Sequence, residues 1–418
     1  MSRAVKFLVL LLLVPLTFLL SGCGGSAATT KGSGGGSGSG SGSGGSKGVP
    51  GYGEGTGSSG QTGAAHFLYA NPLPGGGPDA TVIQSGGTLT AAPSGSANNI
   101  NPMTMAIDPS GTFLYQVAQG YSGGTQGGLF VSAIDRTTGA LGVSAGTCLT
   151  GQALTADVVD TSGKFLYVFG ANGVYAFTIQ SGVLTPVSGS PYATPGPSSP
   201  GYSQPATLMA VDQMDKFLYV STSGGIEAYS INATTGQLTP VAGSPFAASV
   251  ASPWTIVVTP NNSFLYALSS TNTADLYGFS INQSTGALTA VSGSPFSTGT
   301  CGTVTPPGTS GVPGPDNMTI ASAGKFMYDN CGVYSLDPTT GAVAQVFNQG
   351  PGDWPVIDPT GDFLWAIAAD QQSCFHCDIG VQTYQVDPNT GAFTAVQNGY
   401  FLLTNSAVGS VSSLAITK

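Results

Sequence analysis

The chain has 418 residues, and its 64 glycines and 28 prolines exclude a mainly helical protein, because both residue types break helices. Only 7% of the residues are charged and 41% are hydrophobic, which excludes disorder along the whole length. The net charge of −10 leaves no basic surface for a phosphate backbone. We therefore expect no nucleic-acid partner.

The first 23 residues have the pattern of an export signal. Arg3 and Lys6 precede an apolar run from Phe7 to Leu20, which is shorter than the ~20 residues of a membrane-spanning helix. The junction Leu20-Ser21-Gly22-Cys23 resembles the lipobox of bacterial lipoproteins. That resemblance implies that residues 1–22 are a removed signal peptide and that Cys23 carries acyl chains such as palmitate. An ordinary secretory signal with a chance cysteine is the alternative.

A lipidated Cys23 would anchor the protein to a membrane of the bacterial cell envelope, on the outer-membrane or periplasmic side. Residues 23–63 follow the signal and consist mostly of glycine and serine. Such a segment behaves as a flexible tether with a root-mean-square reach of roughly 35 Å. The globular part, residues 64–418, is thus predicted to stand clear of the lipid surface.

One aromatic triplet recurs seven times in residues 64–418, about every 49 residues. Repeats of this length, built from short strands, are typical of propeller blades with four strands each. The seven copies begin at Phe67, Phe113, Phe165, Phe217, Phe264, Phe326 and Phe363.

Each triplet is predicted to form the second strand of a blade, with its Phe and Tyr in the core. The first triplet has no strand before it, whereas residues 411–417 form an apolar strand that no triplet follows. We infer that this carboxyl-terminal strand joins the first blade and closes the ring. The predicted fold is an all-β, seven-bladed β-propeller of four-stranded antiparallel blades.

The repeated motifs carry a family resemblance. Asp108-Pro109-Ser110-Gly111, the triplet, and a later Asp-x-x-Thr-Gly-x-Leu pattern such as residues 135–141 are similar to the lactonase-like, YVTN-like propellers. That family includes the bacterial propeller-type 6-phosphogluconolactonases and the muconate-cyclising enzymes. The resemblance implies a lactone hydrolase or isomerase, and it carries over no catalytic residue.

The long insertions fall between the second and third strands of a blade or between blades, which places them on one face of the ring. Loops held by a rigid scaffold often build binding sites, although padding of a tolerant surface is the alternative. We predict a carbohydrate or protein ligand on this long-loop face. The insertions are residues 188–205, 294–316, 369–380 and 398–408.

Five cysteines map to the same face. Cys301 with Cys331 would staple the longest insertion to its blade, Cys374 with Cys377 would close a small loop, and Cys148 is left over. Residues 374–377 could also suggest a metal site, but a tetrahedral zinc site needs four well-placed ligands, which this segment does not supply. We expect no metal and no other cofactor.

The catalytic inventory is short. The lysines and Arg136 map to the tether, the short-turn face or the chain end, which disfavours a phosphorylated substrate. Asp157 and Asp353 are the candidate catalytic acids. The candidate binding residues are Trp254, Trp354, Asp316, Asp329 and Asp370; packing between blades is the alternative for the tryptophans.

Two hypotheses for the function follow. The first is a monomeric, lipid-anchored module that binds or scaffolds a carbohydrate or protein. The second is an extracytoplasmic lactonase-like enzyme, in which a channel Asp assists the attack of water on a neutral lactone. A titratable group in the channel would distinguish them, because an enzyme needs one.

Overall fold

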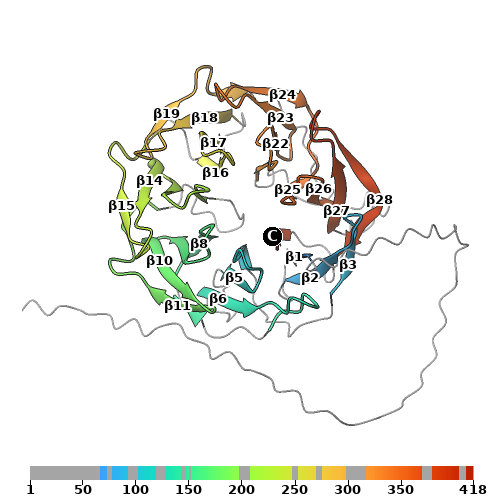
Figure 1. The fold of residues 1–418 in the computed structure, drawn as a ribbon, viewed down its shortest axis with the longest axis horizontal. Helices are drawn as coiled ribbons and strands as arrows, with labels where there is room; N and C mark the ends of the chain where they lie inside the picture. The colour runs from blue at the N-terminus through green and yellow to red at the C-terminus, as the bar shows by residue number, and fades with distance from the viewer. Residues whose placement is uncertain are drawn as a thin grey trace, which may run out of the picture.

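The seven predicted blades are present and form a closed ring (Figure 1). A computed structural model describes residues 66–72, 78–92, 102–118, 128–142, 147–149, 152–196, 208–246, 253–269, 275–297, 317–369, 379–403 and 411–417. The predicted signal peptide, Cys23 and the tether lie outside these residues. In the described part of the chain, no helix is long and apolar enough to cross a membrane.

Each blade is an antiparallel sheet, and its strands are given below from the ring centre outward. Blade 1 contains β29 (Val411–Ile416), β1 (His66–Pro72), β2 (Asp79–Ile83) and β3 (Leu89–Ala91). Blade 2 contains β4 (Pro102–Ile107), β5 (Phe113–Ala118), β6 (Gly128–Ala133) and β7 (Thr147–Cys148). Blade 3 contains β8 (Leu154–Val159), β9 (Phe165–Gly170), β10 (Gly173–Gln180) and β11 (Val183–Pro186).

The remaining four blades continue this order around the ring. Blade 4 contains β12 (Met209–Val211), β13 (Phe217–Thr222), β14 (Gly225–Ile231) and β15 (Leu238–Pro240). Blade 5 contains β16 (Pro253–Val258), β17 (Phe264–Ser269), β18 (Asp275–Ile281) and β19 (Leu288–Ala290), with β20 (Phe296–Ser297) also paired to β18. Blade 6 contains β21 (Thr319–Ile320), β22 (Phe326–Tyr328), β23 (Val333–Leu336) and β24 (Val343–Phe347), and blade 7 contains β25 (Asp353–Ile357), β26 (Phe363–Ala369), β27 (Ile379–Val386) and β28 (Phe393–Leu402).

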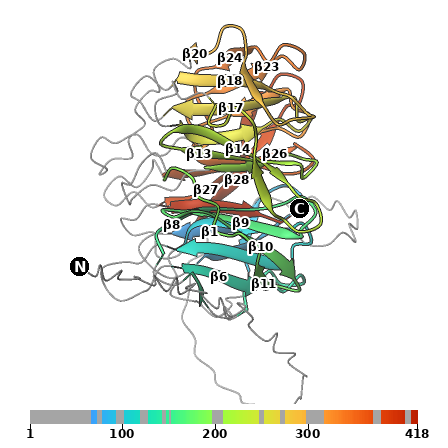
Figure 2. The same cartoon turned by 90° about the vertical axis from the view of Figure 1, so that its left-hand side faces the viewer.

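The triplets form the second strands, as predicted, and they build the core between blades. In β9, Phe165 and Tyr167 pack in one cluster with residues of blade 4, while Leu166 packs in another with residues of blade 2. Successive side chains of a strand point to opposite faces, so a blade between two neighbours buries both faces. The disc is accordingly one strand length thick (Figure 2).

In most blades the turn after the innermost strand is held by the side chain of its first residue. In blade 2, the backbone N–H groups of Thr112 and Phe113 donate to Asp108 Oδ1 at 2.8 and 2.6 Å. In blade 4, Asp212 Oδ1 accepts from the N–H of Phe217 at 2.8 Å. These carboxylates hydrogen-bond the backbone of their own turns.

The carboxyl-terminal strand closes the ring as predicted. β29 pairs antiparallel with β1, with Leu68 opposite Ile416. The Phe67 N–H donates to Thr417 Oγ1 at 2.8 Å, and the Thr417 N–H donates to the Phe67 carbonyl at 3.0 Å. Thr417 thus has the role of the turn Asp in blade 2, although no peptide bond links it to the strand that it holds.

The outer strands extend further than the sequence predicted. After β11, β15 and β19, a Gly-Ser-Pro-Tyr or Gly-Ser-Pro-Phe sequence brings the chain back to the third strand of the blade, for example Tyr192 to Val174. Cys148 likewise lies in β7 rather than in a loop, and β28 runs through Leu402, inside the predicted insertion 398–408. The fourth strand is shorter than the third and pairs with only part of it. The rest of that edge of the third strand has backbone groups that the returning chain can pair with.

Candidate functional site

Asp157 lies at the boundary between blades 2 and 3, on an innermost strand. It belongs to β8, where it pairs with Val168 of β9. Its Oδ1 atom accepts a hydrogen bond of 2.6 Å from the Thr104 hydroxyl of β4. Its Oδ2 atom is buried and has no hydrogen-bond partner among the described residues.

Burial raises the pKa of Asp157 to about 7, because it removes the carboxylate from water. Hydrogen bonds from Thr104 and from the backbone of Asp157 and Ala106 oppose this rise in pKa. An acid with a pKa near 7 exists in both protonation states at neutral pH. That is the property a general acid or base needs.

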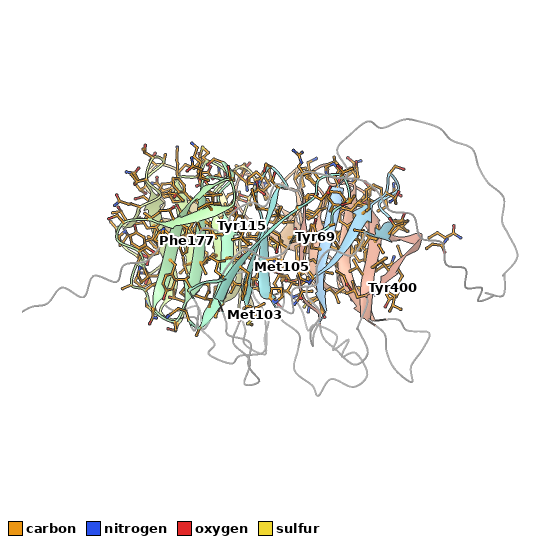
Figure 3. The ribbon with its side chains drawn as sticks, turned by 90° about the horizontal axis from the view of Figure 1, so that it is seen from below. Tyr69, Met103, Met105, Tyr115, Phe177 and Tyr400 are labelled. Carbon is orange, nitrogen blue, oxygen red and sulfur yellow. The ribbon has the colours of Figure 1, made fainter. Side chains whose placement is uncertain are left out.

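The acid at position 157 departs from the internal repeat. It is the third residue before the turn residue that ends the innermost strand, and six other residues hold the equivalent place. All six are apolar: Met105, Met209, Ile256, Met318, Pro355 and Leu414. Figure 3 shows Met105 deeper in the disc than Met103, so the repeat places Asp157 at that inner level.

Asp353 is the second predicted catalytic acid, and the structure places it elsewhere. It lies in β25 opposite Ile367 of β26, so it belongs to blade 7. Burial raises the pKa of Asp353, while a hydrogen bond with the Asn330 side chain opposes the rise. Figure 1 shows β8 and β25 on different sides of the ring, so the two acids belong to blades that are not neighbours.

Trp354 and Asp329 are both buried. Trp354 is 5% exposed and packs with Leu68, Ile367 and Leu414, which is the packing between blades that the sequence left open as an alternative. It offers no open ring face for stacking on a ligand. Asp329 is fully buried, and its Oδ1 accepts from the backbone N–H groups of Cys331 and Gly332 at 2.8 and 2.7 Å.

The other predicted site residues lie outside the described side chains. They are Trp254, Asp316, Asp370, Cys23, Cys301, Cys374 and Cys377. Cys331 is described and is 6% exposed, in the turn before β23, the third strand of blade 6. Its pairing with Cys301, and that of Cys374 with Cys377, stay predictions. The described residues contain no group of three or more His, Cys, Asp and Glu that could hold a metal ion.

The described cations lie at the opposite end of the strands from the long insertions. Lys164, Lys216 and Lys325 each directly precede a triplet, and Arg136 lies in the turn after β6. The sequence has no other Lys or Arg between Lys47 and Lys418. No cationic side chain is thus supplied by the insertions themselves.

Two buried polar contacts were not predicted from the sequence. Thr104 was not singled out, because nothing in a single strand shows that a residue of the next blade will meet its hydroxyl. Glu227 in β14 is also buried, and its Oε2 accepts from the Ser244 hydroxyl at 2.6 Å. A comparison of repeat positions would have signalled Glu227, since Tyr175 and Tyr277 hold the equivalent place in the neighbouring blades.

The sequence matches the family described as lactonase, seven-bladed β-propeller, over residues 79–402. The chain belongs to this lactonase family. The match covers most of the ring, and the structure supplies the seven blades that the family is named for. No curated protein matches the sequence.

Solved structures share the fold of this lactonase-family chain. A candidate 6-phosphogluconolactonase from Bacteroides fragilis has a TM-score of 0.62 at 16% identity, covering 86% of this chain and 100% of its own. A periplasmic gluconolactonase from Pseudomonas aeruginosa has a TM-score of 0.58 at 15% identity, covering 85% and 99%. A protein from Lactobacillus plantarum has a TM-score of 0.63 at 16% identity, covering 85% and 100%. At these identities the likeness shows the fold alone.

Proposed function

We propose that this propeller is a lactone hydrolase in which Asp157 activates water. The observation that carries the proposal is the buried carboxyl on the inner strand of blade 3, with a pKa raised to about 7 and one oxygen that has no partner among the described residues. Membership of the lactonase family supports the same reaction class. From the sequence alone, a binding or scaffolding module was the first hypothesis and a lactonase-like enzyme the second.

The chemistry requires one proton acceptor and one proton donor. Asp157 takes a proton from water as the water oxygen attacks the lactone carbonyl carbon. The ring C–O bond then breaks, and the alkoxide that leaves takes the proton back from Asp157. One water is consumed, the product is a hydroxy acid, and the carboxylate of Asp157 is regenerated.

The substrate is a lactone without a phosphate group. Arginine and lysine bind phosphate through charge-assisted hydrogen bonds, and phosphate sites are built around them. The long insertions have neither residue, and the described cations lie at the other end of the strands. Binding of a phosphorylated lactone would leave its charge without a partner.

Hydrolysis of two matched lactones tests the proposal. Glucono-δ-lactone and its 6-phosphorylated form are incubated with the soluble domain, residues 64–418, and acid release is followed by pH-stat. We expect turnover of the neutral lactone, a preference for it over the phosphorylated one, and a loss of about 100-fold or more in Asp157→Asn. Asp353→Asn is the matched control, because its carboxyl is also buried on an innermost strand but hydrogen-bonds the Asn330 side chain. Absence of turnover on a wider panel of lactones would leave the binding module as the account of function.

The location of the enzyme is a separate proposal. We propose that Cys23 carries lipid and holds the ring at the cell envelope, with residues 23–63 as the tether. The support is the lipobox-like sequence alone. Membrane fractionation of the full chain and of Cys23→Ala tests it, and recovery of both in the soluble fraction would contradict it.

A further inference from the structure

The hydroxyl of Thr104 hydrogen-bonds one of the two carboxyl oxygens of Asp157. Thr104 lies in β4 of blade 2 and is 7% exposed. It donates to Asp157 Oδ1 at 2.6 Å across the junction of the two blades. Oδ2, the other oxygen, has no partner among the described residues. The two oxygens of one carboxyl are therefore in different environments.

Repeat positions show that this contact is not a general feature of the ring. The fourth residue before the turn is Thr104 in blade 2, Ala156 in blade 3, Leu208 in blade 4, Thr255 in blade 5, Asn317 in blade 6, Trp354 in blade 7 and Ser413 in blade 1. The hydroxyls of Thr255 and Ser413 are buried and have no hydrogen-bond partner in the described part of the ring. The next blade has a methionine where blade 3 has Asp157 in both cases, Met318 after Thr255 and Met105 after Ser413.

We propose that Thr104 is the positioning residue of the hydrolytic site, and this inference rests on the proposed function. Its hydroxyl occupies Oδ1, fixes the plane of the carboxyl group, and leaves Oδ2 as the atom that takes the proton from water. A carboxylate that accepts a hydrogen bond is stabilised in its ionised form. Thr104 thus also keeps part of the Asp157 population ionised at neutral pH, in spite of burial.

Among the described residues, few other groups act on the Asp157 carboxyl. On β4, the strand of blade 2 that Asp157 faces, the side chains on either side of Thr104 are the apolar Met103 and Met105. Within blade 3, Asp157 pairs with Val168 of β9. β5 also packs against β8, and its one titratable side chain is Tyr115, whose burial raises its pKa and keeps it uncharged. On β12, which also packs against β8, the side chains are apolar. The pKa of Asp157 responds to burial and to three hydrogen bonds, of which only that from Thr104 comes from a side chain.

The experiment measures the pKa of Asp157 directly, in protein labelled with ¹³C at the aspartate carboxyl carbons. The signal is assigned with Asp157→Asn and followed as a function of pH in wild type, Thr104→Val, Thr104→Ser and Thr255→Val. We expect Thr104→Val to raise the pKa of Asp157 by roughly one unit, Thr104→Ser to restore it, and Thr255→Val to leave it unchanged. The titration needs no substrate, and native dispersion of the spectrum shows that each variant is folded.

The same variants are then compared in lactone hydrolysis. Thr104→Val is expected to shift the rising limb of the pH profile of kcat/KM upward by the change in pKa, with Thr104→Ser close to wild type. An unchanged Asp157 pKa in Thr104→Val would overturn the role of Thr104. If the pKa moves but wild type hydrolyses no lactone, the contact is real and the proposed function is wrong, so the two failures are distinguishable.

Discussion

The indole Nε1–H of Trp365 donates a hydrogen bond of 2.9 Å to the carbonyl of Gly87, and this bond joins the last blade to the first. Thr383 Oγ1 donates to the same carbonyl at 3.1 Å. Trp365 is the third residue of its triplet, and Gly87 lies in the turn before β3. The ring is thus secured at this seam by side chains as well as by β29.

The same relationship recurs around the ring, with tyrosine in place of tryptophan. Burial keeps the hydroxyls protonated by raising the pKa of each tyrosine, so they act as donors over a wide pH range. The pairs are Tyr69 with Gly139 at 2.9 Å, Tyr167 with Gly236 at 3.4 Å, Tyr219 with Gly286 at 3.2 Å, and Tyr266 with Gly341 at 3.0 Å.

Tyr69→Phe removes one of these bonds without changing the shape of the core. We expect it to lower the free energy of unfolding by about 1–2 kcal/mol, because the carbonyl of Gly139 loses its donor. Tyr115→Phe is the control, since the buried Tyr115 hydroxyl has no hydrogen-bond partner among the described residues and its removal should cost little or nothing. Urea unfolding compares the two variants, and equal losses would show that the hydrogen bond contributes nothing.

The turn glycines meet the triplet phenylalanines at every junction. Gly236 has φ +72°, and a Cβ added there would lie 2.5 Å from Cδ1 of Phe165. Gly236→Ala should therefore lower the free energy of unfolding by roughly 2–4 kcal/mol, through the left-handed backbone and the clash. Gly86→Ala has open space and should be nearly neutral. The contrary result is a Gly236→Ala protein with the urea midpoint of wild type.

Thr417 holds the seam between the two chain ends. Thr417→Val removes the acceptor of the Phe67 N–H and leaves that buried donor unpaired, at a cost of about 1–3 kcal/mol. Thr417→Ser keeps the oxygen and should retain most of the stability. Thermal unfolding distinguishes the two variants, and a valine variant as stable as the serine variant would contradict the role of this hydroxyl.

Asp157 makes stability fall as pH rises. Its folded pKa of about 7 is above the unfolded value, so the folded state holds its proton over a window in which the unfolded state loses it. Stability is lost as pH rises from about 4 to 7, and Asp157→Asn should gain roughly 1–3 kcal/mol on wild type across that window. Urea midpoints from pH 4 to 8 measure the difference.

Asp135→Asn should change the pH dependence of stability in the opposite direction, and it is measured in the same series of urea midpoints. Backbone hydrogen bonds from Thr137 and Thr138 lower the pKa of Asp135, so its contribution is present above the unfolded pKa and lost in acid. Asp135→Asn should therefore be less stable than wild type at pH values above about 4, where the wild-type carboxylate is ionised. If the stability of both variants changed with pH in the same way as that of wild type, neither carboxyl would have a shifted pKa.

The fold could be predicted because it repeats. A triplet seen seven times, together with a turn motif that recurs in most blades, specifies strand order and blade number, and the orphan strand at residues 411–417 specifies the closure. The ends of the outer strands could not be predicted, since Gly-Ser-Pro resembles a loop. Only the structure shows Ser190 Oγ accepting from the Ala176 N–H of the adjacent strand at 3.0 Å.

Only part of the candidate site could be predicted from the sequence. Asp157 stood out as a rare acid near the channel, but its partner Thr104 lies in another blade and belongs to an ordinary strand sequence. Trp354 was equally prominent, yet its large apolar ring is buried between blades 7 and 1. Burial and contacts across a junction depend on the angle between blades, which no single repeat encodes.

The pH dependence of kcat/KM for a neutral lactone tests the central claim most directly, because it reports the pKa of the acting group in the free protein. The account predicts a rate that rises with pH to a plateau, with a midpoint near 7 in wild type and no such limb in Asp157→Asn. A midpoint near 4, or a limb near 7 that survives in Asp157→Asn, would contradict it.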